Sequence, residues 1–291
     1  MRIIIAGASG YIGKALAREL INKQHQVVPV NREVLYGPPE KLRNRISDSD
    51  VVVNVAGANI LQRWTNKNKR RICESRIRTT ANLIKAIEGL PEAKQPGKYI
   101  SISGINVYRS GLCHTETSTD FDPGFLGNLV KNWESASSGL PAHINRVIFR
   151  TGAVLGEKSK PVRYLYIPVK LGLGTIVGSG RQPFPFIHIR DVVKAFIGAI
   201  EEPQVSGTYN LVAPQRITHA DYVRTMAKCL KRPVFFRIPG FMLRPVFGKA
   251  SVVITESPEV IPQRLLDEGF EFDYATIERA LWNIWSRRHF E

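Results

Sequence analysis

The sequence predicts an α/β protein with a doubly wound parallel sheet and a smaller C-terminal lobe. Three observations support this fold class. Short apolar runs alternate with amphipathic segments through the first 150 residues, which is typical of strands and helices that alternate along a chain. Most of these runs are continuously apolar, as expected for strands that are buried on both faces. A glycine-rich loop joins the first run to the first amphipathic segment.

The first half of the chain supplies most of the predicted sheet. The run Arg2–Ala6 is rich in β-branched residues, and the spacing of Ile12, Leu16 and Leu20 predicts a helix directly after it. In order, we expect strands at 2–6, 26–30, 50–56, 99–103 and 147–149, and helices at 10–23, 72–88 and 130–137.

The second half is less regular. Glycines and prolines between residues 172 and 185 predict a loop-rich excursion after residue 156. We expect a helix at 191–202, a strand at 207–212, and amphipathic helices at 218–231 and 275–285, the last with Leu281, Trp282, Ile284 and Trp285 on its buried face. The predicted domains are a nucleotide-binding unit of residues 1–156 plus 186–214, and a substrate-side lobe of residues 157–185 plus 215–291.

Basic residues exceed acidic ones by 16 in this chain of 291 residues. Seven basic residues lie between Arg63 and Arg78, and seven more between Arg224 and Lys249, where no acidic residue occurs. Such an excess favours anionic partners. No nucleic-acid reader motif is present, so a specific nucleic-acid partner is not expected, although a polyanion-binding face and two merely solvated faces both remain open.

The chain shows no apolar stretch of the length that a membrane-spanning helix needs, so a membrane partner is not expected. Its three cysteines are far apart, which favours a reduced compartment. The apolar run begins at residue 2 without a leading signal, so we expect a cytoplasmic protein, or an organellar one if a targeting segment has been removed. The scattered histidines predict no metal site. An oligomer is compatible with the sequence.

The loop Gly7-Ala-Ser-Gly10-Tyr-Ile-Gly13 has the spacing of a dinucleotide phosphate loop. Glycine at the first position permits the tight turn, the second lets the backbone approach a pyrophosphate, and the third lets the helix pack on the sheet. Glycines also serve ordinary turns, but the strand before this loop and the helix after it favour a Rossmann-type cofactor site. Its predicted residues are Gly7, Ser9, Gly10, Tyr11, Ile12 and Gly13.

Asn31 and Arg32 follow the second predicted strand, where an NAD site usually carries a carboxylate for the ribose 2′-hydroxyl. A guanidinium can instead bind a 2′-phosphate through charge-assisted hydrogen bonds. The alternative is an ordinary surface arginine. We therefore predict NADP(H) as the cofactor.

With these motifs the chain resembles the extended short-chain dehydrogenase/reductases of the NAD(P)-binding Rossmann superfamily, and within them the atypical "epimerase family" group 39U. The matching segments include 5–13, 54–60, Trp133-Glu134, 150–156, 184–191, 207–210 and 260–264. This resemblance implies that Val55 and Ala56 line the middle of the cofactor, that Arg76 contributes to its site, and that Val154 lies near the nicotinamide.

The family's catalytic pattern is degenerate in this chain. The resemblance places Leu126 and Val130 where the family carries tyrosine and lysine, and Gly104 where it carries a serine or threonine. Ser103 and Tyr108 are the remaining candidates for catalytic hydroxyls, and a packed structural tyrosine is the alternative for Tyr108. His188 and Asp191 resemble a segment beside the family's cleft, with either a structural or a catalytic role.

Two cofactor-dependent functions remain open after the sequence, beside a polyanion-binding protein that uses the face from Arg224 to Lys249. One is an NADP(H)-dependent oxidoreductase or epimerase-like enzyme with an unidentified small-molecule substrate. The other is an NADP(H)-binding sensor or scaffold without turnover.

Overall fold

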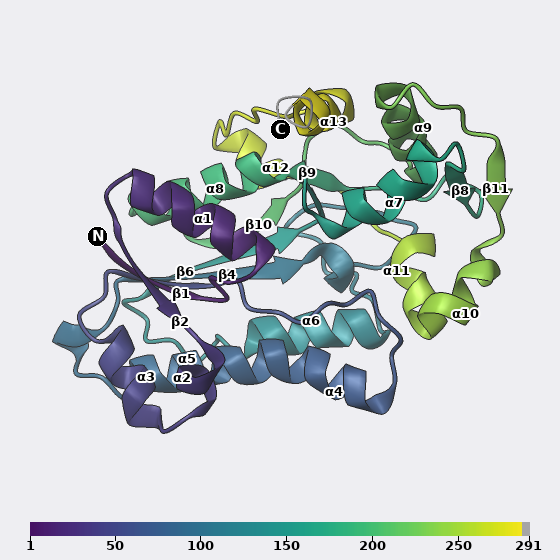
Figure 1. Cartoon of the computed structure of the whole chain (residues 1–291). Helices are drawn as coiled ribbons and strands as arrows, with labels where there is room; N and C mark the ends of the chain where they lie inside the picture. The colour runs from purple at the N-terminus through teal and green to yellow at the C-terminus, as the bar shows by residue number, and fades with distance from the viewer. Residues whose placement is uncertain (287–291) are drawn as a thin grey trace.

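The computed structural model describes residues 1–286 and contains a six-stranded parallel sheet at its centre (Figure 1). The sheet order is β10-β6-β4-β3-β1-β2. Its strands are β1 (Arg2–Ala6), β2 (Gln26–Val30), β3 (Val51–Asn54), β4 (Lys98–Gly104), β6 (Asn145–Thr151) and β10 (Gly207–Leu211). This confirms the predicted fold class and all six sheet strands.

Helices cover both faces of the sheet. α1 (Tyr11–Asn22) and α8 (Ile189–Glu201) pack on one face, where Ile3, Ile5 and Phe196 belong to one buried cluster. The opposite face carries α2 (Arg32–Tyr36), α3 (Pro39–Ile46), α4 (Asn66–Cys73), α5 (Thr79–Glu88) and α6 (Phe125–Ser135) (Figure 1). Because helices cover both faces of the sheet, side chains on either face are buried. This explains why the strands carry continuous apolar runs.

Strands β1 and β3 lie side by side in the sheet. The chain passes from β1 to β2 on one side and then crosses back to form β3 on the other side, so the strand order reverses between β1 and β3. In open α/β sheets, ligands bind at the carboxyl ends of the strands at such a switch point. We therefore expect a ligand site at the residues that follow Ala6 and Asn54.

The smaller lobe packs over the carboxyl end of the sheet around its own buried cluster, which includes Val162, Val169, Met226 and Ile284. Its elements are β7 (Ala153–Leu155), α7 (Lys160–Lys170), β8 (Thr175–Val177), β9 (Phe186–His188), α9 (His219–Cys229), β11 (Phe236–Ile238), α10 (Arg244–Phe247), α11 (Val252–Thr255), α12 (Gln263–Asp267) and α13 (Ile277–Ser286). Short strands β5 (Cys113–His114) and β12 (Glu259–Val260) pair with each other. The predicted domain boundaries stay a prediction.

Four local predictions were wrong. The helix expected at 130–137 begins five residues earlier and spans Phe125–Ser135. The excursion after residue 156 contains α7 and β8, because the buried Val162 and Val169 hold a helix that includes Pro168. Trp282 lies on the exposed side of α13, whereas Trp285 is buried. The helix expected at 72–88 begins at Asn66 and passes through one π-helical turn at Glu74–Arg78 between α4 and α5.

Candidate functional site

The loop after β1 touches the end of β3. Gly7 has a φ of +88°, and a Cβ placed on it would stand 2.7 Å from the backbone nitrogen of Ala56. A side chain at this position would both strain the backbone and separate the two loops. The switch point therefore depends on glycine at residue 7, and it brings Val55 and Ala56 against the glycine loop.

The other two loop glycines shape the start of α1. Gly10 donates a backbone hydrogen bond of 2.9 Å to the carbonyl oxygen of Gly7, and a Cβ on Gly13 would collide with that same carbonyl. Gly10 is the N-cap residue of α1, and no side chain in the described part of the chain caps this helix. The exposed Ser9 and Gly10 leave the helix start open to an anion, which the helix dipole favours.

The side chains of Tyr11 and Ile12, in the same loop, pack against other parts of the protein. The hydroxyl of Tyr11 lies against Gly156, and burial together with the Glu157 carboxylate raises the pKa of Tyr11 to about 12. Ile12 packs against the core beneath α1, and Val154 of β7 packs against the same cluster. Any contact of Tyr11 or Ile12 with a phosphate would therefore use the backbone.

Asn31 and Arg32 stand at the end of β2, where α2 begins. The side chain of Asn31 caps α2 by accepting a hydrogen bond of 3.0 Å from the backbone nitrogen of Val34. Arg32 is exposed, and within residues 1–286 its guanidinium makes no hydrogen bond or ion pair. The cap fixes the start of α2 and leaves the cation of Arg32 free for a ligand.

Arg76 places a buried guanidinium at the site. The π-helical turn brings its guanidinium under the loop after β3, where Nη2 donates a hydrogen bond of 3.0 Å to the carbonyl oxygen of Ala58. The residue is buried, its Nε has no partner among the described residues, and none of these residues forms a salt bridge with it. Burial lowers the pKa of Arg76 to about 10.

A buried cation without a carboxylate is unfavourable by itself, and an anionic ligand would compensate it. A hydrogen bond also joins the π-helical turn to the loop after β3: the hydroxyl of Ser75 accepts a hydrogen bond of 2.9 Å from the backbone nitrogen of Ala58. π-helical turns are frequent at functional sites. The glycine loop, the open start of α1 and the two arginines together fit a phosphorylated dinucleotide.

The three positions of the degenerate catalytic pattern carry no polar side chains. Leu126 and Val130 are buried on α6, and a Cβ placed on Gly104 would stand 3.9 Å from Cγ2 of Val130. The contact between Gly104 and Val130 agrees with the expected arrangement, and the assignment of Leu126 and Val130 to the family's catalytic positions stays a prediction. No proton can be exchanged by their side chains.

Ser103 and Tyr108 belong to one buried network. Ser103 Oγ donates a hydrogen bond of 2.7 Å to Glu134 Oε1, and the same carboxylate accepts two hydrogen bonds from Arg150, of 2.7 and 2.9 Å. Arg150 Nη1 donates to the hydroxyl of Tyr108 at 2.8 Å, and that hydroxyl donates to Asn210 Oδ1 at 2.9 Å. Both hydroxyls are occupied by structural partners.

The surroundings of Tyr108 are those of a core residue. It is fully buried, its ring stacks on His114 with centroids 4.8 Å apart, and burial raises the pKa of its phenol. The catalytic interpretation of Tyr108 and Ser103 therefore stays a hypothesis that this geometry does not favour.

His188 and Asp191 connect the sheet domain to the segment before α13. His188 caps α8 through Nδ1, and its ring packs against Tyr274. The carboxylate of Asp191 accepts backbone hydrogen bonds from Asp273 at 2.8 Å and Tyr274 at 3.1 Å. These contacts support a structural role for both residues.

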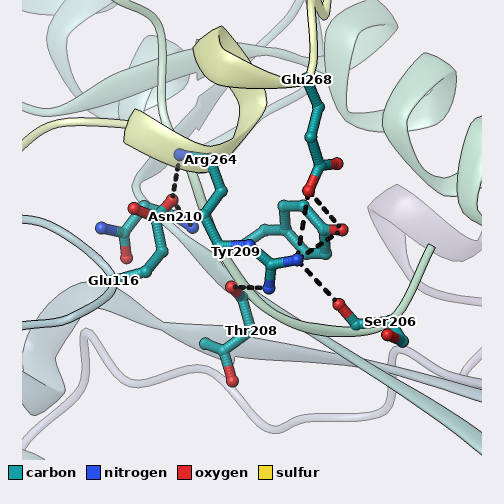
Figure 2. A network of polar contacts seen from close by, with 7 residues as sticks. All are labelled: Glu116, Ser206, Thr208, Tyr209, Asn210, Arg264 and Glu268. Atoms are coloured by element: carbon teal, nitrogen blue, oxygen red, sulfur yellow. Dashed lines mark hydrogen bonds and ion pairs between the residues drawn. The ribbon is translucent and has the colours of Figure 1, made fainter.

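A second network, which the sequence did not predict, fastens the segment around α12 to the sheet (Figure 2). Arg264 donates from its guanidinium to the carbonyl oxygens of Ser206 and Thr208, and its guanidinium carbon lies 4.0 Å from the ring centroid of Tyr209. Glu116 accepts a hydrogen bond of 2.9 Å from the backbone nitrogen of Asn210. The sequence had marked segment 260–264, and its role is to hold the lobe on the edge strand β10.

Known proteins resemble this chain over its full length. Residues 3–124 match the model of the NAD dependent epimerase/dehydratase family, and residues 238–284 match a domain of unknown function, DUF1731. The mouse epimerase family protein SDR39U1 is 35% identical, with 98% of this chain and 99% of the mouse protein covered. An Arabidopsis thaliana homologue, described as chloroplastic, is 26% identical, with 97% and 86% covered.

Among solved structures, human SDR39U1 (isoform 2), crystallised with NADPH, superimposes with a TM-score of 0.91 at 34% identity, covering 98% of this chain and 99% of the human one.

Proposed function

Because the chain belongs to the epimerase family that includes SDR39U1, we propose that it is an NADP(H)-dependent oxidoreductase of the extended short-chain dehydrogenase/reductase type. Its substrate would be a small molecule with a carbonyl or carbinol carbon. The lobe over the carboxyl end of the sheet, formed by residues 157–185 and 215–291, would provide the substrate side.

The guanidinium of Arg76, which is buried without a carboxylate partner among residues 1–286, is the observation that carries this proposal. It lies against Gly57 and Ala58 in the loop after β3, and this loop contacts the glycine loop where Ala56 meets Gly7. NADPH, with which the human relative was crystallised, has the phosphates that such a site requires. Arg32 would bind the 2′-phosphate and Asn31 would fix the helix that carries Arg32.

NADPH supplies a hydride when it is bound. The residues around the degenerate pattern would position the acceptor through apolar contacts, because Leu126 and Val130 are apolar and the hydroxyl of Ser103 already donates its hydrogen bond to Glu134. The proton that a reduced carbonyl oxygen needs would then come from solvent or from the substrate itself. An acceptor of this kind has to be reactive enough to do without a tyrosine donor.

The second candidate is an NADP(H)-binding sensor or scaffold without turnover. It is favoured by the apolar contact between Val130 and the Gly104 position, where a proton relay would be required. The two candidates share the cofactor site and differ only in chemistry.

Single-turnover experiments with deuterated NADPH separate the two. The protein is first titrated with NADPH and NADH by calorimetry, and the NADPH complex is then mixed with a panel of aldehydes, ketones and enones. Deuterium transferred to any product supports the oxidoreductase. Tight NADPH binding with no transfer across the panel supports the sensor, and no heat with either cofactor at millimolar concentration would refute both.

The structure shows no helix among residues 1–286 that is long and apolar enough to cross a membrane. The cytoplasmic location stays a prediction, with an organelle as the alternative, and so does the oligomeric state.

A further inference from the structure

One end of the molecule combines exposed apolar side chains with an unbroken excess of basic residues. The elements there are α7, β8, β11 and α10, which lie together at the right-hand end of Figure 1, away from the N-terminus. Strands β8 and β11 pair in parallel, and Tyr164 of α7 contacts Phe247 of α10 with ring centroids 6.4 Å apart. These contacts make residues 160–177 and 231–249, which include these elements and their connections, parts of one surface, which we call the lobe face.

The lobe face concentrates exposed large apolar residues. Phe235, Leu171 and Phe241 are 78%, 68% and 65% exposed. Among residues 1–286, nine of the fourteen strongly exposed large apolar side chains belong to this face, namely Tyr164, Ile167, Leu171, Leu173, Phe235, Phe236, Phe241, Met242 and Val246. Single exposed apolar residues are ordinary, but such a concentration marks a binding surface.

The charge of the same segments has one sign. Residues 158–190 and 222–255 contain thirteen lysines and arginines and no aspartate or glutamate. All thirteen are exposed, and seven of them lie among or beside the exposed apolar residues: Arg163, Lys170, Lys231, Arg232, Arg237, Arg244 and Lys249. A second copy of this face would meet it with the same positive charge, so self-association through it would be repelled.

We propose that the lobe face binds the surface of an anionic lipid bilayer. The exposed phenylalanines and aliphatic residues would enter the boundary between headgroups and acyl chains, and the surrounding arginines and lysines would bind the anionic headgroups. A nucleic acid would satisfy the cations but leave the apolar residues in water. The expectation of no membrane partner rested on the absence of a spanning segment, which does not bear on peripheral binding.

Vesicle flotation tests this inference with the full chain. Phosphatidylcholine vesicles are compared with vesicles that contain about 30 mol% phosphatidylserine, which gives the bilayer a negative surface potential. The protein is expected to float with the anionic vesicles and not with the neutral ones. Raising the salt concentration should weaken binding, because exposed charges are screened.

Two variants separate the contributions of charge and apolar contact. Arg232→Gln/Arg237→Gln/Arg244→Gln should weaken binding on the order of a hundredfold, given the contribution of each basic residue near an anionic surface. Phe235→Ser/Phe241→Ser should weaken it at least about tenfold. Leu266→Ser/Trp282→Ser, which changes two exposed apolar residues outside the lobe face, is the matched control and should bind like the unchanged chain.

All variants are first checked for thermal stability and NADPH affinity, so that an unfolded variant is not scored. Absence of wild-type binding to anionic vesicles overturns the inference. So does binding that the phenylalanine variant leaves unchanged, because the apolar residues would then have no part in it. A dimer in solution that this variant dissociates, without any vesicle binding, would instead assign the lobe face to a protein contact.

Discussion

Ser103 donates its hydroxyl hydrogen to Glu134 across a distance of 2.7 Å, from the end of β4 to the last turn of α6. The same carboxylate neutralises Arg150, and Arg150 in turn binds the phenol of Tyr108. Both hydroxyls that the sequence nominated for catalysis therefore serve a buried network. Their contribution is expected in the stability of the protein.

Tyr108→Phe tests this directly. The substitution removes one hydroxyl and leaves Arg150 Nη1 and Asn210 Oδ1 without that partner. We expect the free energy of unfolding to fall by about 1–3 kcal/mol, as for other buried polar groups that lose a hydrogen bond. NADPH affinity and any turnover should be unchanged. A loss of turnover at unchanged stability would restore Tyr108 as a catalytic residue.

Glu134→Gln should affect stability more strongly. It leaves the guanidinium of Arg150 buried without a carboxylate, and breaking such a pair typically lowers stability by about 3–5 kcal/mol. Denaturant unfolding measures the change. Glu40→Gln is the matched control, because Glu40 forms an exposed pair with Arg43 and its loss should change stability by less than about 1 kcal/mol. Equal effects of the two variants would contradict the structural role of the network.

Arg32→Asp should distinguish the two nicotinamide cofactors. Its exposed guanidinium is predicted to bind the 2′-phosphate, which NADH lacks. Charge-assisted hydrogen bonds of this kind contribute about a 10- to 100-fold factor in affinity. Calorimetry should therefore show weaker NADPH binding and unchanged NADH binding. Arg45→Asp, the same charge change on α3, controls for the overall field, and equal losses for both cofactors would refute the assignment.

The sequence predicted the sheet well because its signal is local. The apolar runs at residues 2–6 and 50–56 identify strands without any knowledge of their neighbours. Helix α7 was missed because Pro168 and the following glycines argue against a helix, and only the packing of Val162 and Val169 on the lobe overrides them. Trp282 was assigned to the wrong side of α13, where one residue corresponds to a rotation of about 100°.

The candidate site likewise has one part that the sequence predicts and another part that it does not. The glycine loop could be predicted because its turn, its strand and its helix are contiguous. Arg76 came from the resemblance alone, since no sequence pattern indicates the π-helical turn that carries its guanidinium under Ala58. The partners of Ser103 and Tyr108 lie 31 and 42 residues farther along the chain, so their burial could not be inferred from neighbouring residues.

Arg76→Met should separate cofactor binding from stability. Within residues 1–286 its buried guanidinium has no carboxylate partner, so replacing it with an apolar side chain of similar length removes an unfavourable buried charge. We expect the unliganded protein to be as stable or more stable, while NADPH affinity falls at least about tenfold. Arg70→Met on the exposed side of α4 is the control. Reduced stability with unchanged affinity would make Arg76 a purely structural residue.

His219 gives a prediction for pH. Burial lowers its pKa to about 4, and its Nδ1 has no partner within residues 1–286. The unfolded chain binds this proton near pH 6.5, so the folded state loses stability as the pH falls from about 6.5 to about 4. His188, whose pKa burial also lowers to about 4, acts in the same direction. Asp191 opposes them, because burial raises its pKa to about 6 and its penalty disappears on acidification.

Two histidines against one carboxylate leave a net loss of stability in acid, and His219→Phe should reduce that loss by about 2 kcal/mol. The phenylalanine ring can occupy the apolar site, where Phe184 already meets the imidazole edge to face. Denaturant unfolding at pH 7, 6, 5 and 4.5 measures the difference between the two proteins. His143→Phe, which removes an exposed histidine, is the control. A variant curve parallel to that of the unchanged protein would mean that His219 is protonated in the folded state as readily as in the unfolded chain.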